Sequence, residues 1–264
     1  MATRPTKKQI YHVQSLDRAF DILGCFSLRK QELDLDEICE QTRLPKPTTF
    51  RLLAALEQAR FVERTATGQK YQVGIRAFEL GGIFLAHLSV ESVARPLMER
   101  LTEQYKMTCN LAILDDGQAI YIATTDPPGP LHYSSIIGYR HYVHCSALGK
   151  ALIIDLPDEQ VKRILRQRGM PALSPNTITE PDVLLSELVK TREQGYAIDN
   201  QEGAVGFCCL GVPIRNRANG IVAAISVSAA SPQMTPNTIP TIARDLQATA
   251  RDISKQLGWS EQSA

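Results

Sequence analysis

The sequence contains no run of 18 or more apolar residues, which is what a membrane-spanning helix requires. Its first residues, MATRPTKKQIYHVQ, are basic but lack the apolar core of a secretory signal. The cysteines lack the spacing of a disulfide framework, which favours a reducing compartment. They are Cys25, Cys39, Cys109, Cys145, Cys208 and Cys209. We therefore expect a cytoplasmic protein that makes no contact with a membrane.

Motifs of several enzyme classes are also absent. There is no G-x-S-x-G elbow, no H-E-x-x-H zinc motif and no glycine-rich dinucleotide fingerprint. The sequence therefore predicts no enzyme and no cofactor. One alternative stays open, because a cysteine hydrolase needs a thiol, a nearby base and an orienting acid. Cys209, His144 and Asp199 could be combined in that way.

One histidine-rich segment leaves a metal-binding sensor as a further alternative. It contains His141, His144 and Cys145, and a metal ion would need at least one more ligand. Asp199 or His132 could supply it. Polar packing is the more common role of such a cluster, so we predict no metal site.

Length and composition are those of a globular protein with room for two ordinary domains. The chain has 264 residues, of which 44% are hydrophobic and 22% are charged, and its net charge is +1. Residues 1–86 hold 13 Lys and Arg against 10 Asp and Glu, whereas the remainder holds 16 against 18. Binding to a polyanion is therefore expected from the N-terminal part.

Residues 34–73 have the pattern of a helix, a tight turn, a second helix and a β-ribbon. Leu35, Ile38 and Cys39 follow helical spacing, and Thr42–Pro45 interrupts it. The second helix begins near Pro47, because proline is tolerated in a first helical turn. This order is typical of a helix-turn-helix domain.

The second helix has one apolar and one unusual face. Its apolar stripe consists of Leu52, Leu53, Leu56 and Ala59. On the opposite face, Phe50 lies beside Arg51, which makes a poor solvent surface. The DNA major groove would suit such a face, because it offers thymine methyl groups, guanine acceptors and phosphates. We therefore predict that this helix reads DNA.

The segment FVERTATGQKYQV alternates, turns at Thr67-Gly68 and alternates again, which predicts a two-stranded wing. Arg64 and Lys70 are expected near its tip. The whole pattern predicts a winged helix-turn-helix. The residues predicted to contact DNA are Lys46, Pro47, Thr48, Phe50, Arg51, Gln58, Arg64 and Lys70.

Two further helices are expected around this unit. The first covers residues 16–27, with Ser15 as its N-cap. Its apolar stripe consists of Leu16, Ala19, Phe20, Leu23 and Phe26. The second starts at Ile75, ends near Leu88 and is the natural linker. Gly81-Gly82 in its middle is either a hinge or a point of close packing.

The rest of the chain predicts an α+β domain, a sheet with antiparallel strands covered by helices. The Asp116-Gly117 pair predicts a tight turn between the first two strands, and Gly195 closes a helix. Strands are expected at 108–116, 119–125, 131–137, 139–143, 196–202, 206–215 and 220–229. Helices are expected at 92–105, 146–156, 158–168, 180–194 and 235–257.

Several segments closely resemble the IclR family of bacterial transcription regulators. They are SLDRAFDIL, LPKPTTFRLLAALEQARFVER, YQVGIRAFELG, HCSALGKALI, TREQGYAIDNQE and AAISVSAA, and the resemblance runs from Val13 to Gly258. It implies a winged helix in residues 1–74, a linker helix in 75–90 and a GAF-like effector-binding domain in 91–264. It also implies dimers, often paired into tetramers. The chain departs from the family pattern at Pro47 and Phe50, which affects the expected base preference.

The C-terminal domain is expected to hold the effector. Ser226 and Ser228 share one face of a strand, and hydroxyls in a sheet interior need partners that a bound carboxylate or hydroxy acid can supply. The turn before Ala147 leads into a helix whose first amides are free to bind an anion, whereas Lys150 lacks the spacing of a phosphate-binding loop. The resemblance to the IclR family adds Leu131, Tyr133, Asp199 and Cys209 as further positions of the effector pocket. The predicted effector-binding residues are Leu131, Tyr133, Ala147, Leu148, Asp199, Cys209, Ser226 and Ser228.

The sequence therefore predicts a transcription regulator that binds a double-stranded DNA operator as a homodimer or tetramer. A small organic acid would control it, and Tyr133, Tyr139 and Tyr142 slightly favour an aromatic one. A repressor of a catabolic operon is favoured over an activator. A purely architectural DNA-binding protein would leave the large second domain without a purpose.

Overall fold

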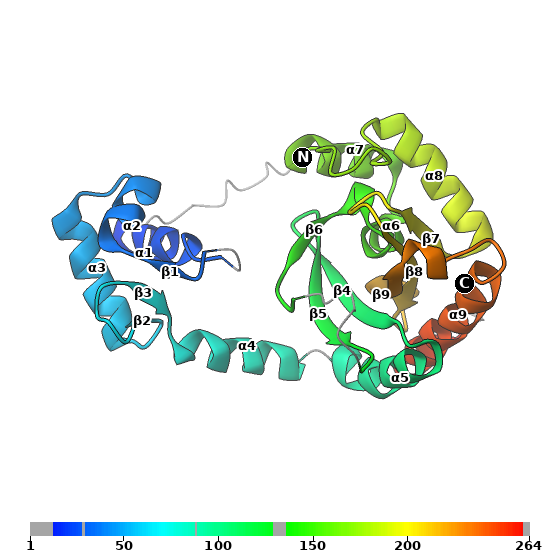
Figure 1. The fold of residues 1–264 in the computed structure, drawn as a ribbon, viewed down its shortest axis with the longest axis horizontal. Helices are drawn as coiled ribbons and strands as arrows, with labels where there is room; N and C mark the ends of the chain where they lie inside the picture. The colour runs from blue at the N-terminus through cyan, green and yellow to red at the C-terminus, as the bar shows by residue number, and fades with distance from the viewer. Residues whose placement is uncertain (1–12, 28–29, 88, 129–135, 261–264) are drawn as a thin grey trace, which may run out of the picture. The chain divides into compact units, whose positions relative to one another are not determined.

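The computed structural model describes residues 13–27, 30–87, 89–128 and 136–260 of the chain. Contacts divide the chain into two compact units, residues 1–84 and 85–264 (Figure 1). No helix in these described ranges is both long and apolar enough to cross a membrane.

The first unit is a small helical core with a β-ribbon. Its three-stranded antiparallel sheet has the order β1-β3-β2, so the prediction of a two-stranded wing was incomplete. Strand β1 has only two residues, too few to give a recognisable alternation. The elements are α1 (Gln14–Gly24), β1 (Glu32–Leu33), α2 (Leu35–Thr42), α3 (Lys46–Gln58), β2 (Val62–Arg64) and β3 (Tyr71–Val73), followed by α4 (Ile75–His87).

Helix α1 differs from its prediction. It starts one residue before Ser15, so Val13 occupies the N-cap position and no side chain caps the helix. Ile22 is fully buried, whereas Leu16 is 53% and Phe20 65% exposed. The predicted apolar stripe was therefore wrong at Leu16 and Phe20. Phe26 lies beyond the end of the helix.

Both ends of α2 are fixed by local chemistry. Asp34 and Glu37 form a capping box, because each side chain accepts from the other residue's backbone amide at 2.9 Å. Arg43 ends α2 in the left-handed conformation, and α3 then begins at Lys46. Leu53 is fully buried, as its stripe predicted. Ala59 is exposed, because α3 has already ended at Gln58.

The predicted linker helix is present as α4, and it carries an open apolar surface. Large side chains along it are 43–76% exposed, namely Ile75, Phe78, Leu80 and Ile83. A Cβ atom added at Gly81 or Gly82 would meet nothing within 4 Å. The described chain therefore gives no support to the close-packing alternative for this glycine pair.

The second unit is a six-stranded antiparallel sheet with the order β6-β5-β4-β9-β8-β7, flanked by helices (Figure 1). Its strands are β4 (Thr108–Asp115), β5 (Gln118–Thr125), β6 (Arg140–Tyr142), β7 (Ala197–Asn200), β8 (Phe207–Arg215) and β9 (Ile221–Ala230). Its helices are α5 (Ser89–Tyr105), α6 (Ala147–Ile153), α7 (Asp158–Arg168), α8 (Pro181–Gln194) and α9 (Ile239–Gln256), with short 3₁₀ turns η1 (Val143–Cys145) and η2 (Ser231–Gln233).

The two faces of this sheet differ. Helices α5 and α9 pack on one face over a large apolar core that includes Cys208, Leu210 and Val212. Helix α6 packs on the other face over a smaller cluster that is lined largely by alanines. This second face, the α6 face, is where the polar side chains lie.

Four predicted elements need correction, and one of them is helix α5, which begins at Ser89 rather than at Ser92. Residues 131–135 of the predicted strand 131–137 lie outside the described residues, and Ile136 and Ile137 are not in a strand. Helix α6 ends at Ile153 rather than at Leu156. Helix α9 begins at Ile239, because Thr235 and Thr238 exchange side-chain and backbone hydrogen bonds in a preceding turn.

Candidate DNA-binding and effector sites

The exposed face of α3 carries an aromatic ring beside a free cation. Phe50 is 50% exposed, and Arg51 is exposed and makes no hydrogen bond or ion pair with another described residue. Pro47 and Gln58 are also exposed, and Thr48 is half-buried. The face predicted to read DNA is therefore open to a partner.

Lys46, at the first position of α3, already has an acidic partner. Its ammonium lies 2.5 Å from a carboxylate oxygen of Asp36, and this hydrogen bond raises the pKa of the lysine. Both side chains are more than 60% exposed. Exposed pairs of this kind contribute little to stability, so a phosphate can replace the carboxylate at small cost.

Arg64 is held by the wing itself. Its guanidinium lies 4.7 Å from the centre of the Tyr71 ring, donates to the Tyr71 hydroxyl at 2.9 Å and donates to the Gly68 carbonyl at 3.1 Å. A carboxylate oxygen of Glu57 lies 3.6 Å away. Arg64 therefore ties the wing turn to its strands, while Lys70 in that turn is exposed.

In the second unit, side chains from three strands meet on the α6 face. Asp199 of β7 pairs with Cys209 of β8, and Cys209 pairs with Ser228 of β9. Paired residues point to the same face, and Ser226 lies two positions before Ser228. Asp199, Ser226 and Ser228 are at most 6% exposed. The sheet thus brings together four of the predicted effector-binding residues.

The start of α6 lies directly over this row. A Cβ atom on Gly211 would lie 2.5 Å from the Ala147 carbonyl oxygen, so only glycine permits this approach. Gly211 pairs with Ser226. The Ser146 hydroxyl accepts from the Gly149 amide at 3.1 Å, which leaves the amides of Ala147 and Leu148 as the uncapped ones of the first turn. Leu131 and Tyr133 lie outside the described residues.

Asp199 is a buried carboxylate rather than a surface one. It accepts from the Glu202 amide at 2.7 Å and from the Gly203 amide at 3.4 Å. Burial raises its pKa to about 6. Lys150 is fully buried and donates to Glu202 at 2.6 Å and to the Ile198 carbonyl at 2.7 Å. Lys150 is therefore unavailable for a phosphate.

The histidines and cysteines of this region do not form a reactive group. The His141 Nδ1 lies 3.8 Å from the Cys145 sulfur, and the His144 Nε2 lies 3.2 Å from the Pro171 carbonyl. Burial lowers the pKa of both histidines and raises that of the Cys145 thiol to about 12. Burial also raises the pKa of Cys209, whose hydrogen-bond partner is Ser228. The described residues contain no group of three possible ligands that could hold a metal ion.

Comparison with known proteins gives the family. Residues 15–66 match the IclR helix-turn-helix domain, and residues 83–255 match the C-terminal domain of bacterial transcriptional regulator IclR. The chain belongs to the IclR family of bacterial transcriptional regulators. It is 32% identical to the HTH-type transcriptional repressor AllR of Escherichia coli K12 over 93% of this chain and 90% of AllR.

Solved structures of IclR-family proteins have the same two-domain architecture. The Thermotoga maritima IclR shares 28% identity with a TM-score of 0.74, covering 94% of this chain and all of the other. An IclR regulator of Alicyclobacillus acidocaldarius shares 25% identity with a TM-score of 0.82, covering 93% and 99%. A Microbacterium hydrocarbonoxydans IclR homologue, solved with 4-hydroxybenzoate, shows the same fold at 23% identity, a TM-score of 0.82 and coverage of 93% and 99%.

Membership of the IclR family decides between the function classes. The protein is a DNA-binding transcriptional regulator, and the family is one of regulators rather than enzymes. The cysteine hydrolase alternative is thereby set aside. The geometry agrees, because burial raises the pKa of the Cys209 thiol and disfavours the thiolate that a nucleophile requires.

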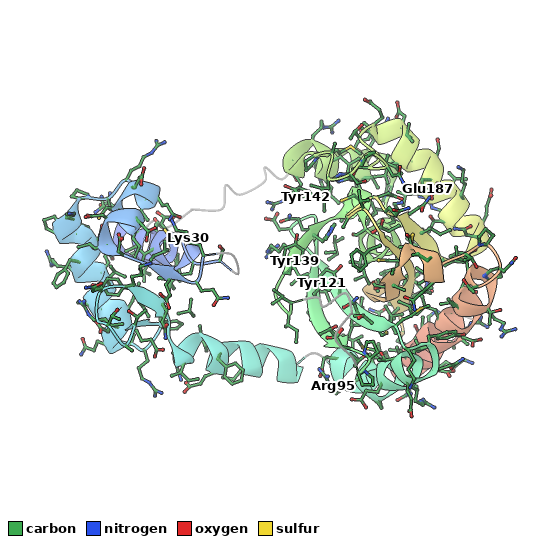
Figure 2. All side chains as sticks on the ribbon, in the orientation of Figure 1. Lys30, Arg95, Tyr121, Tyr139, Tyr142 and Glu187 are labelled. Carbon is green, nitrogen blue, oxygen red and sulfur yellow. The ribbon has the colours of Figure 1, made fainter. Side chains whose placement is uncertain are left out.

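Two of the three tyrosines predicted to favour an aromatic effector, Tyr139 and Tyr142, pack against other rings, and Tyr133 lies outside the described residues. Tyr121 and Tyr139 (Figure 2) have ring centres 6.2 Å apart. The ring centres of Tyr142 and His144 are 5.6 Å apart. Tyr121 is buried on the α6 face, and Tyr139 is 39% exposed. Their existing contacts give no separate support to an aromatic ligand.

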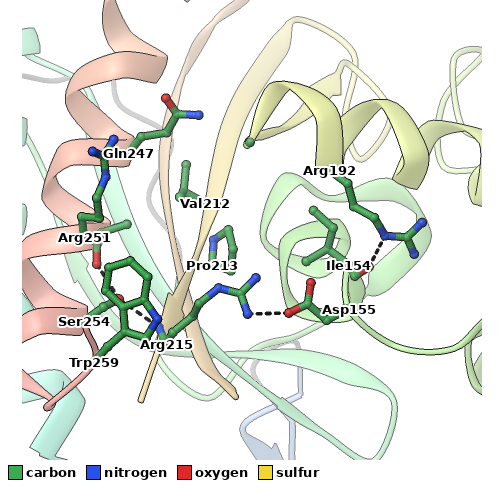
Figure 3. Close-up of a pocket in the computed structure, with 12 residues that line it drawn as sticks. Ile154, Asp155, Arg192, Val212, Pro213, Arg215, Gln247, Arg251, Ser254 and Trp259 are labelled. Carbon is green, nitrogen blue, oxygen red and sulfur yellow. Dashed lines mark hydrogen bonds and ion pairs between the residues drawn. The ribbon is translucent and has the colours of Figure 1, made fainter. Parts of the chain in front are cut away.

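A cavity of about 340 Å³ lies away from the predicted effector residues (Figure 3). Arg215 reaches across it to Asp155 at 2.5 Å, and Arg192 donates to the Ile154 carbonyl at 2.7 Å. The lining residues are Ile154, Asp155, Arg192, Gly195, Val212, Pro213, Arg215, Gln247, Ala250, Arg251, Ser254 and Trp259.

Two residues of the α6 face were missed by reasoning from the sequence. Asn110, in the middle of β4, is fully buried, and Thr124 lies beside it on β5. Alternation along TCNLAILDD places Asn110 on the same face as Ala112, so a buried asparagine was detectable. Its alignment with Ser226 was not detectable, because strand register depends on pairing between distant segments.

Proposed function

We propose that this protein is an operator-specific repressor whose DNA binding is controlled by a small organic acid. The observation that carries the proposal is the row of buried donors and acceptors on the α6 face. Asp199, Ser226 and Ser228 are buried on this face, and a few convergent polar groups shielded from water are what a small-molecule site requires. The repressor function of AllR supports repression over activation.

The DNA-binding half of the proposal rests on the open face of α3. Arg51 would contact base edges, with Phe50 against thymine methyl groups, while Lys46 and Lys70 would contact phosphates. Pro47, Thr48 and Gln58 would complete the contact surface. Arg64 would act mainly by holding the wing turn in place.

A dimer would bring two such heads to one operator. Its support is the apolar surface of the N-terminal unit, where Phe20 is 65% and Phe78 is 76% exposed. Exposed aromatic side chains of this size are typical of interfaces. We place the winged helix in residues 1–74, the linker in 75–90 and the effector domain in 91–264.

The effector would bind with its acid group at the start of α6. The Ala147 and Leu148 amides and the Ser226 and Ser228 hydroxyls would donate to a carboxylate, and such charge-assisted hydrogen bonds are the stronger kind. Asp199, ionised above pH 6, would accept from a donor elsewhere on the effector. Cys209 would line the same pocket, closed by Leu131 and Tyr133.

The experiment is a binding assay with the full-length protein and the promoter DNA next to its own gene. We expect binding that far exceeds binding to unrelated duplex and that changes when an organic acid is added. A thermal-shift screen of catabolic acids would find the effector, since a ligand at 100 times its Kd adds about 2.7 kcal/mol of stability. Equal affinity for any duplex would refute the proposal.

The dimer is tested separately by light scattering. We expect a stable dimer that Phe78→Glu weakens, because a charge would replace an apolar contact. Val183→Glu, at an exposed apolar position of α8, is the matched control and should leave the dimer unchanged. A dilute monomer that binds a palindromic site with one head would contradict the dimer.

A further inference from the structure

Asn110 and Thr124 extend the polar row of the α6 face toward the β5 side of the sheet. Asn110 pairs with Ser226 on one side and with Thr124 on the other. Since residues paired in an antiparallel sheet point to the same face, both side chains face the same volume as Ser226. Polar side chains on the α6 face therefore follow one another across neighbouring strands, from Cys209 on β8 to Thr124 on β5.

A bulge in β5 makes this arrangement possible. Ala112 pairs with Tyr121 and Leu111 with Ala123, so Ile122 is an extra residue in the strand. Because of this insertion, Tyr121 and Thr124 point to the same face although they are three positions apart. A regular strand would have turned Thr124 away from Asn110.

Both side chains have an unused polar atom. The Asn110 amide nitrogen donates to the Ser228 hydroxyl at 3.3 Å. The Asn110 Oδ1 and the Thr124 Oγ1 are buried and have no hydrogen-bond partner in the described part of the chain. Buried polar groups in native proteins are almost always paired, so these two neighbouring exceptions indicate a partner beyond the described residues.

We propose that Asn110 and Thr124 bind a hydroxyl group of the effector, which makes the effector a hydroxy acid. The inference rests on the proposed effector site. The Asn110 Oδ1 can only accept, so its partner must be a donor and cannot be a carboxylate. A hydroxyl fits best, because it donates to Asn110 while it accepts from Thr124. The acid group then lies at the start of α6 and the hydroxyl at the β4–β5 end.

The test compares acids that differ by their hydroxyl groups, using the full-length protein and titration calorimetry. The pairs are 4-hydroxybenzoate with benzoate, and glycerate with propionate. In the parent protein the hydroxylated member of at least one pair should bind about tenfold more tightly, the effect of one buried hydrogen bond. Asn110→Leu and Thr124→Val should each reduce this preference to about twofold or less.

Thr125→Val is the matched control. Thr125 follows Thr124 on β5, and its hydroxyl is already bonded to that of Thr102 at 2.7 Å. This variant should keep the hydroxyl preference but lose thermal stability without ligand. Thr124→Val should not lose stability, because it removes an unpaired buried hydroxyl rather than a bonded one. Equal losses of Tm in the two variants would overturn the inference without any ligand.

The binding results separate this inference from the function on which it rests. If an acid binds through Ser226 and Ser228 but the Asn110 and Thr124 variants keep the parent's preference, the hydroxyl site is wrong and the effector site stands. If none of a broad set of acids binds or alters operator binding, the effector site is wrong and this inference falls with it.

Discussion

The polar surface of α3 and the polar face of the second unit's sheet are built in opposite ways. Arg51 and Lys46 lie in water, where side chains exchange partners at little cost. Asp199, Lys150 and Ser228 lie in the interior, where each lost partner leaves an uncompensated group. A surface that meets a polyanion must stay solvated until contact, whereas a surface that selects one small molecule must exclude water.

This difference predicts where substitutions matter. On α3, a single change should alter binding and leave folding intact. On the α6 face, a change at Lys150 or Glu202 should alter folding first, because these residues support the sheet beneath the proposed ligand.

The largest effect is expected from the buried ion pair. Lys150→Met removes the cation that faces Glu202 at 2.6 Å, so the free energy of unfolding should fall by about 3–5 kcal/mol. Lys162→Met is the control, since Lys162 pairs with Asp182 at the surface and its loss should be hardly measurable. Urea unfolding gives the free energy of unfolding of both variants. Similar changes in the two variants would abolish the contrast between interior and surface.

The next effect concerns pH. Asp199 has a folded pKa of about 6, above its unfolded value, so the folded state holds a proton that the unfolded state has lost. This contribution to stability is complete below about pH 4 and is lost as the pH rises through 6. The change should amount to about 3 kcal/mol.

Asp199→Asn should therefore lack this pH dependence, when the free energy of unfolding is compared with that of the parent between pH 4 and 7. Asp252→Asn, at an exposed position of α9, should follow the parent curve. A parent and an Asp199→Asn variant with parallel curves would show that Asp199 is not perturbed by burial.

Arg51→Ala should weaken operator binding by about 1–3 kcal/mol and relax sequence preference, because it removes a proposed base contact. The unfolding midpoint should not change, since the exposed Arg51 makes no hydrogen bond or ion pair with another described residue. Binding to operator and mutated operator measures the first effect, and thermal unfolding the second. An unchanged preference would remove Arg51 from the base-reading surface.

The double change of Ser226 and Ser228 to Ala should weaken effector binding by about 1–3 kcal/mol through lost hydrogen bonds. DNA binding without effector should stay intact. Titration calorimetry measures the affinity for the effector, and a DNA-binding assay without effector measures the affinity for the operator. A double variant that responds to the effector like the parent would contradict the site.

The smallest effect is expected at Lys46. Lys46→Ala should reduce the slope of log affinity against log salt by about 0.9, the value of one phosphate contact, and leave specificity unchanged. Glu99→Ala, on α5 of the other unit, serves as the control and should leave the slope as it is. A lost sequence preference instead would place Lys46 at a base edge.

Local chemistry in the sequence determined most of the elements. Helical spacing gave α3 and its buried Leu53, the Asp116-Gly117 pair gave the β4–β5 turn, and Gly195 gave the end of α8. Each depends on neighbours within a few residues, which is why the sequence alone predicts it. The family motifs extended this to the two-domain architecture.

Only the tertiary structure decided which side chains are covered and which strands align. It left Phe20 exposed although its spacing fits an apolar stripe, and it buried Lys150 against Glu202, 52 residues away. It also placed Asn110 between Ser226 and Thr124 through strand register and one bulge. The physical reason is the same in each case. In these cases burial and register arise from packing between segments that are distant in the chain, which the local pattern does not encode.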